Sequence, residues 1–217
     1  MGASSDPTED GQLPAAAGSM AGLVRIGTWN VSHWTTARAA TIVYDVAAAV
    51  LAVQETHLAA LPLDWAKTTA VRLGHSLHHG APAQAVKDSV HGKACGVGFV
   101  AAGGVALSRE LPATTAWRML HAERRVHAVS VPCRRGLPRG LLLVSVYAPL
   151  PSQEVERRRF NAAFTAFTHE LDLQRPTFLL GDFNGTLGGR TPCPLLAHLL
   201  GPGGAWVDLQ GTYCSPH

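Results

Sequence analysis

Short apolar runs of strand length recur along the chain, separated by polar and glycine-containing segments. The runs Leu23–Trp29, Leu51–Gln54, Leu141–Val146 and Thr177–Leu180 are rich in β-branched and other bulky apolar residues, a composition typical of buried strands. Further strands are predicted at residues 95–101, 105–108 and 125–131. Residues 74–94 hold four histidines with Gly, Pro and Ala, and we expect a solvated loop with weak strand content there.

Helical periodicity lies between several of these runs. Residues 160, 164, 167 and 171 place three phenylalanines and a leucine on one helical stripe, and Ser152 is the expected cap of this helix. Glu154 and Glu156 fall in its first turn, where the helix dipole favours acidic side chains. Other helices are predicted after a cap at Thr35 or Thr36, with an apolar face at residues 42 or 43, 46, 47 and 50, and over roughly 63–73 and 195–200.

Alternating strands and helices predict an α/β protein whose sheets are buried by helices. Because several later strands follow one another directly, a mixed sheet or two packed sheets fit better than one parallel sheet. Residues 1–20 are rich in Gly, Ala, Ser, Pro and Asp without periodicity, so we interpret them as a disordered segment. They contain no basic region or long apolar stretch of a secretory signal. Residues 21–217 then form one domain.

Composition narrows the class of protein. Of 217 residues, 47% are hydrophobic and 15% charged, which excludes a wholly disordered chain. No apolar run is long enough to cross a membrane. The cysteines at 95, 133, 193 and 214 are far apart, which is typical of reduced intracellular thiols rather than of a disulfide framework or a zinc knuckle. The histidines at 75, 78, 79 and 91 lack accompanying acidic or cysteine ligands, and we expect no metal there.

Positive charge is concentrated in the second half of the chain. Residues 109–159 hold ten arginines against four glutamates, and 15 of the 18 basic residues are arginine. Arginine binds phosphate in bidentate geometry, so a polyanionic partner is one interpretation. A coding bias toward Arg and Ala is the other. The run Arg157–Arg159 is expected to be a solvated helix face, with phosphate contact as its alternative, and either Arg124 or Arg125 could point into a groove.

Polar side chains stand where four of the predicted strands end. These are Asn30, Glu55, Tyr147, and the pair Asp182 and Asn184. Strand ends are where ligand sites form in α/β sheets, and buried polar groups need partners or an ion. Two carboxylates, two amides and a phenol suit Mg2+ and not zinc. Taken singly, each residue is also compatible with a capped turn, an Asx turn or rim packing.

The same residues resemble the endonuclease/exonuclease/phosphatase superfamily. Four motifs carry the resemblance in order: Thr28–Val31, Gln54–His57, Val146–Pro149 and Gly181–Asn184. The Gln-Glu-Thr-His form and the segment Gly96-Val97-Gly98-Phe99 are most similar to the non-LTR retrotransposon branch, whose endonuclease domains are related to apurinic endonucleases. The resemblance implies a four-layer α/β sandwich, with two mixed sheets face to face and helices outside.

It also implies Mg2+-dependent hydrolysis of phosphodiesters in DNA, with Mn2+ as a substitute. Glu55 would hold the metal with Asn30 beside it, Tyr147 would contact the scissile phosphate, Asp182 would orient or deprotonate water, and Asn184 would donate a hydrogen bond to the phosphate. Retroelement ancestry would add a reverse transcriptase downstream in the full product and a nuclear site of action. No membrane partner is expected.

Two departures from the family pattern alter the expectation. Leu150 stands where members that cleave nucleic acid often carry Asn directly after the Tyr-x-Pro segment. The segment up to His217 also contains no Ser-x-x-Asp-His or Ser-x-Ile-Asp motif. We therefore expect a missing final strand, a C-terminally truncated domain and weak or no activity. A phosphatase or exonuclease acting on another phosphoester, and an inactive remnant of the fold that binds nucleic acid, are the alternatives.

Overall fold

The computed structural model describes residues 25–46, 48–82, 95–133, 138–171, 175–185, 193–202 and 206. The predicted disordered segment 1–20 and residues 207–217 lie outside these ranges, and so does His91. Among the described residues, no helix has the length and apolar character needed to cross a membrane.

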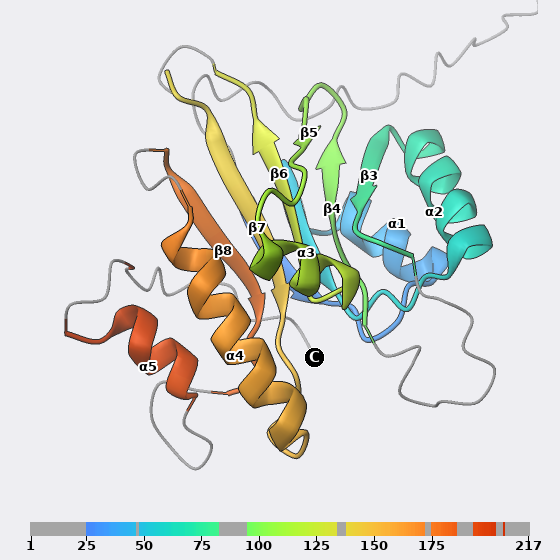
Figure 1. The fold of residues 1–217 in the computed structure, drawn as a ribbon. Coiled ribbons are helices and arrows are strands. Elements are labelled where there is room, and N and C mark those ends of the chain that lie inside the picture. The colour runs from blue at the N-terminus through green and yellow to red at the C-terminus, as the bar shows by residue number, and fades with distance from the viewer. Residues whose placement is uncertain are drawn as a thin grey trace, which may run out of the picture.

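Two four-stranded mixed sheets form the centre of the molecule (Figure 1). The first has the order β1-β2-β4-β3 and the second the order β5-β6-β7-β8. In each sheet one pair is parallel, β1 with β2 and β7 with β8, and the other pairs are antiparallel. The strands are β1 (Ile26–Asn30), β2 (Val50–Gln54), β3 (His75–His79), β4 (Val97–Ala102), β5 (Ser108–Arg109), β6 (Val126–Val131), β7 (Leu141–Tyr147) and β8 (Thr177–Asp182).

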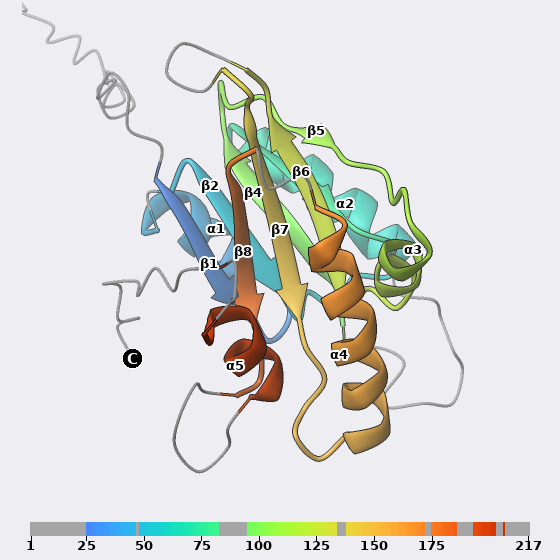
Figure 2. The same cartoon turned by 60° about the vertical axis from the view of Figure 1, so that its left-hand side comes forward.

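Helices cover the outer face of each sheet, which confirms the four-layer prediction (Figure 2). On the first sheet lie α1 (Thr36–Tyr44) and α2 (Ala60–Arg72). On the second lie α3 (Thr115–Ala122), α4 (Glu154–His169) and α5 (Pro194–Leu200). Both faces of the central strands are therefore buried. In β2, Leu51 and Val53 pack under the helices, whereas Val50 and Ala52 pack between the sheets, as the two-residue period of a strand requires.

The phenylalanine stripe of α4 anchors the second helical layer. Phe160, Phe164 and Phe167 are buried and stack on one another and on Trp117 of α3, with Leu171 packed at the margin. Glu154 and Glu156 do lie in the first turn. The N-cap, however, is Gln153 and no side chain caps it, so the prediction of Ser152 as the cap is wrong by one residue.

Other predictions for single elements need correction. Thr35 caps α1 through its hydroxyl oxygen, which accepts from the Arg38 amide, but α1 ends at Tyr44 and residue 50 already belongs to β2. The histidine-rich segment, expected to be a loop with weak strand content, contains the five-residue strand β3. Helix α3 is absent from the sequence prediction altogether. The strand predicted at 105–108 is reduced to the two residues of β5.

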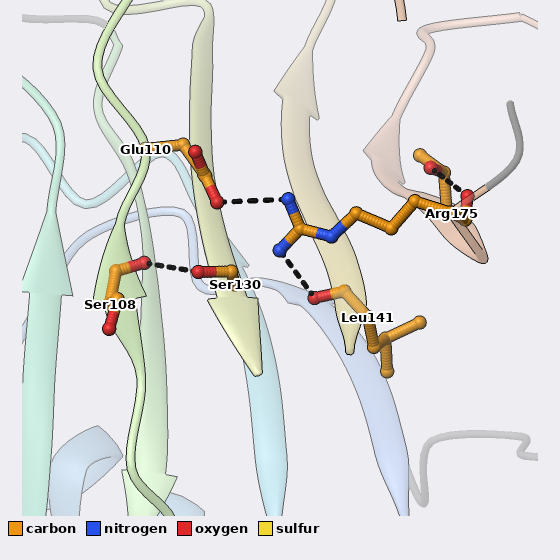
Figure 3. Close-up of polar contacts among 6 residues, drawn as sticks. Ser108, Glu110, Ser130, Leu141 and Arg175 are labelled. Atoms are coloured by element: carbon orange, nitrogen blue, oxygen red, sulfur yellow. Dashed lines mark hydrogen bonds and ion pairs between the residues drawn. The ribbon is translucent and has the colours of Figure 1, made fainter. Parts of the chain in front are cut away.

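An ion pair spans the second sheet from one outer strand to the other (Figure 3). Arg175, just before β8, donates from Nη1 to Glu110 Oε1 over 3.0 Å and from Nη2 to the Leu141 carbonyl oxygen over 3.3 Å. Glu110 follows β5 directly. The Ser130 hydroxyl donates to the Ser108 carbonyl oxygen beside it, at 3.4 Å. These contacts hold the short edge strand β5 on the sheet.

Two buried histidines make the stability of the fold sensitive to acid. His79 and His127 are buried, and burial lowers their pKa values from 6.5 to about 4 and about 3. Between these values and pH 6.5 the unfolded chain binds protons that the folded chain does not, so stability is lost as the pH falls. Each imidazole should remove about 2 kcal/mol of the free energy of unfolding between pH 7 and pH 5.

Urea unfolding at the two pH values measures this loss. Neither ring nitrogen of His127 has a hydrogen-bond partner within the described structure, so His127→Leu should reduce the pH dependence without leaving a partner unpaired. His169, which is exposed on α4, provides the control His169→Leu, with an unchanged pH dependence. Equal pH dependence in the two variants would contradict the assignment.

Candidate active site

Each strand of the two parallel pairs ends at or beside one predicted site residue. Asn30 is the last residue of β1, Tyr147 of β7 and Asp182 of β8, and Glu55 directly follows β2. In-register pairing places Asn30 level with Gln54 in one sheet and Tyr147 level with Asp182 in the other. Parallel strands end on the same side of a sheet, and the strands of both pairs end on the same side of the molecule (Figure 2).

The packing of the two sheets brings these ends together. Strand β1 packs opposite β8, and β2 opposite β7. Across the first of these contacts, Asn30 Nδ2 donates to Asp182 Oδ2 over 2.8 Å. Across the second, the Tyr147 phenol lies beside the Glu55 carboxylate, which helps to raise the pKa of the phenol. The site is thus built from both sheets, and neither sheet alone contains it.

Asn184 completes the set by bonding to both halves. Its backbone amide donates to Asp182 Oδ1 over 2.8 Å, and its Nδ2 donates to the Ala148 carbonyl oxygen over 2.7 Å. With the bond from Asn30, Asp182 therefore accepts one bond on each carboxylate oxygen. The structure brings all five predicted residues together in one network of contacts: Asn30, Glu55, Tyr147, Asp182 and Asn184.

The Tyr147 phenol is held in its protonated form. Burial, together with the neighbouring Glu55 carboxylate, raises the pKa of Tyr147, against the opposing effects of Arg125 and Asn184. The Arg125 guanidinium carbon lies 5.2 Å from the centre of the phenol ring, in a cation–π contact. Of the two arginines at the start of β6, Arg125 is thus the one seen against the site.

Left-handed backbone conformations gather around this end of the sheets. Glu55 and Asn184 have φ of 54° and 48°, and Ser32 and His57 have φ of 52° and 55°. Such angles cost energy in residues other than glycine, and they tend to be retained where function requires the geometry. The turn at Ser32 also directs the Asn30 side chain, because the Ser32 amide donates to Asn30 Oδ1 over 2.9 Å.

Comparison with models of known protein families identifies the family of this chain. The model of the endonuclease/exonuclease/phosphatase family matches residues 27–216. The chain belongs to the endonuclease/exonuclease/phosphatase family. Endonucleases, exonucleases and phosphatases all hydrolyse phosphoester bonds, so the family defines the class of chemistry. Comparison with curated protein sequences gives no significant match.

Solved structures of low sequence identity share this family's fold. The 3' phosphatase NExo from Neisseria, solved with a bound product DNA hairpin, is 20% identical with a TM-score of 0.54, covering 76% of this chain and 60% of its own. The APE2 catalytic domain of Xenopus laevis is 16% identical with a TM-score of 0.56, covering 80% and 64%. An AP endonuclease from Archaeoglobus fulgidus is 13% identical with a TM-score of 0.56, covering 76% and 59%. The chain thus spans about three fifths of these structures.

The donor set of this family member fits a hard cation. Glu55 supplies a carboxylate, and Asn30 Oδ1 keeps a second lone pair beyond the bond from Ser32. Mg2+ is commonly bound by one or two protein carboxylates, with water and substrate phosphate as the remaining ligands. The Glu55 carboxylate and the Asn30 amide oxygen therefore fit a Mg2+ site that relies on water and substrate for its remaining ligands.

Sequence reasoning missed one residue that supports the site. Arg157 was expected on a solvated helix face, but its Nη1 donates to the carbonyl oxygens of Pro149, over 3.1 Å, and Asn184, over 2.9 Å. It thereby joins the segment after Tyr147 to the segment after Asp182. Arg158 is exposed, as expected, and Arg159 pairs with Glu123 over 3.0 Å. Arg157 differs from Arg158 and Arg159 in that its side chain donates to two backbone carbonyl oxygens, which the sequence of the run does not reveal.

Substitution of Arg157 should destabilise the segment after Tyr147 and the segment after Asp182. Arg157→Ala deletes two hydrogen bonds from a charged donor, and we expect a loss of about 2 kcal/mol in unfolding free energy and faster hydrogen exchange at the Asn184 amide. Arg158→Ala is the matched control, since Arg158 makes only a 3.8 Å ion pair with Glu154. Unchanged exchange at Asn184 in Arg157→Ala would show that the two bonds do not hold the segment.

Proposed function

We propose that the protein is a Mg2+-dependent phosphodiesterase that cleaves DNA in the manner of an endonuclease. The observation that carries the proposal is the single network of Asn30, Glu55, Tyr147, Asp182 and Asn184 at the joined ends of the two sheets. Glu55, with Asn30 beside it, would hold the cation. When bound, a divalent cation neutralises charge that develops on phosphoryl oxygens.

The remaining residues have roles that follow from their hydrogen bonds. Asp182 is fixed by donors on both oxygens, so its remaining lone pairs point in set directions and can orient an attacking water or accept its proton. Tyr147 is a protonated phenol whose pKa is raised still further above neutrality, and it can donate to a phosphate oxygen. One of the two Asn184 side-chain N–H groups donates to the Ala148 carbonyl oxygen, and the other can donate to the same phosphate.

Loss of either carboxylate should abolish cleavage. Glu55→Gln and Asp182→Asn preserve size but remove the charge, and we expect each to lower the rate of Mg2+-dependent plasmid nicking by roughly 100-fold or more. Glu156→Gln, on the exposed face of α4, should nick at the wild-type rate. Nicking that persists in both site variants would refute the assigned roles or reveal a contaminating nuclease.

DNA is the favoured substrate because of the charge on the chain. Arginines far outnumber acidic residues over 109–159, and a polymer with repeated phosphates can contact several of them at once. We expect duplex DNA to be cleaved, with weaker binding at higher salt, and inositol phosphates to release no phosphate. Turnover of inositol phosphates without DNA nicking would favour the alternative of a phosphatase.

We propose that the domain derives from a retroelement product, because the Gln-Glu-Thr-His and Gly-Val-Gly-Phe segments are most similar to that branch of the family. Residues 186–217 contain no Ser-x-x-Asp-His motif, so we expect these 217 residues to nick DNA weakly. The full gene is tested for a segment that carries this motif and for a reverse transcriptase. If neither is encoded and no nicking occurs, an inactive DNA-binding remnant is the better description.

A further inference from the structure

An open cavity of about 380 Å³ lies near the edge strands β3 and β5 of the two sheets. Its lining comes from the end of β3, from the first turns of α2, from β5 and from α3. The site proper lies toward the other side of the sandwich, at β1, β2, β7 and β8. The cavity is nevertheless on the same end of the molecule, because the end of β3 and the end of β2 both pair with the start of β4.

The cavity gathers positive charge from two separate elements, α2 and β5. Lys67 of α2 and Arg109 of β5 both line it, and within the described structure neither forms a salt bridge with a carboxylate. Asp64, the acidic residue in the lining, is not among the ion pairs of the described ranges. Helix α2 begins without a capping side chain, and Ala60 of its first turn also lines the cavity. The positive end of the helix dipole therefore adds to the two cations.

His121 orients one of the two cations, the Arg109 guanidinium. Its Nε2 lies 3.1 Å from Arg109 Nη2 and accepts from it, which requires a neutral ring at that nitrogen. Burial and the Arg109 charge lower the pKa of His121. The cavity therefore holds two cations, Lys67 and Arg109, that form no salt bridge within the described structure. The His121 imidazole orients the Arg109 side chain.

One hydrogen bond connects the cavity to the site. Thr56, which follows Glu55, has its hydroxyl 2.6 Å from His79 Nε2, and both residues are buried. His79 Nδ1 lies 3.1 Å from the Gly80 carbonyl oxygen and donates to it, so Nε2 is the acceptor for Thr56. The position of the cavity relative to Glu55 is thus fixed by the core, and an anion held in the cavity would have a defined place relative to the site.

We propose that this cavity is a phosphate-binding subsite, formed by Lys67, Arg109 and the first turn of α2, for a phosphate other than the one that is cleaved. The inference rests on the proposed function, since a second phosphate at a fixed separation is a property of a nucleic acid strand. Lysine and arginine are the side chains that bind phosphate as a point charge and in bidentate geometry, and an uncapped helix start favours an anion. A free phosphate ion or nucleotide would be bound by the same groups, and the experiments below distinguish it from a nucleic acid strand.

The test measures binding of a short fluorescent DNA duplex in EDTA, so that no cleavage is involved. Lys67→Ala and Arg109→Ala should each weaken binding roughly three- to tenfold at about 0.1 M salt and reduce the slope of log affinity against log salt by about one. Arg72→Ala on α2 and Arg118→Ala on α3 are matched controls, because both side chains are exposed and neither lines the cavity. Equal behaviour of the cavity variants and the controls would overturn the subsite.

A second measurement separates the two sources of phosphate. Inorganic phosphate is titrated while the His121 ring is followed by NMR, in wild type and in Lys67→Ala. If millimolar phosphate shifts the His121 resonances in wild type but not in Lys67→Ala, and Lys67→Ala binds DNA as wild type does, the cavity binds a small anion. That result would overturn the proposal that it binds a phosphate of a nucleic acid strand. Lys67-dependent DNA binding by a protein that does not nick would refute the proposed activity and leave the subsite standing, whereas nicking with Lys67-independent binding refutes only the subsite.

Discussion

A buried hydrogen-bond circuit between the two sheets underlies the geometry of the site. Gln54 Oε1 accepts from the Thr28 hydroxyl, and Gln54 Nε2 donates over 3.1 Å to Ser145 Oγ. Ser145 in turn donates to the Val53 carbonyl oxygen. Gln54 and Ser145 are almost fully buried, so breaking the circuit would leave polar atoms without water or partners. The circuit therefore favours one register of β2 against β7, and Glu55 and Tyr147 follow those two residues within one or two positions.

The arrangement of the strands explains why the polar residues can be so far apart in sequence. The parallel pair of each sheet faces the parallel pair of the other, so four strand ends meet without any long loop. The Asn30–Asp182 bond joins residues 152 positions apart because both stand at strand ends that packing alone brings together. Rigid strands and buried side chains hold such a site more closely than loops would, and the left-handed angles at Glu55 and Asn184 are maintained by that surrounding structure.

The sequence predicted those parts of the fold in which local pattern and burial agree. Apolar runs became strands and the phenylalanine stripe became α4, because each pattern has the period of its element. It failed where tertiary packing decides the outcome. The histidines of β3 resemble a polar loop, yet Leu77 and His79 are buried by α2 and β4. Helix α3 is only eight residues long, too short for its period to be recognised. Arg157 differs from Arg158 only in what the folded chain places beside it.

The strand-end residues determine the type of reaction, whereas the surrounding surface determines which substrate is bound. The network around Asp182 fits hydrolysis of a phosphoester of any kind, since every phosphoester presents the same oxygens to it. Selectivity for a polymer must come from cations outside that network, which a second phosphate could reach. In the proposed subsite these cations are Lys67 and Arg109, which line the same cavity as His79. The Thr56–His79 hydrogen bond connects this cavity to the residue that follows Glu55, so a strand with one phosphate at the network could place a second phosphate there.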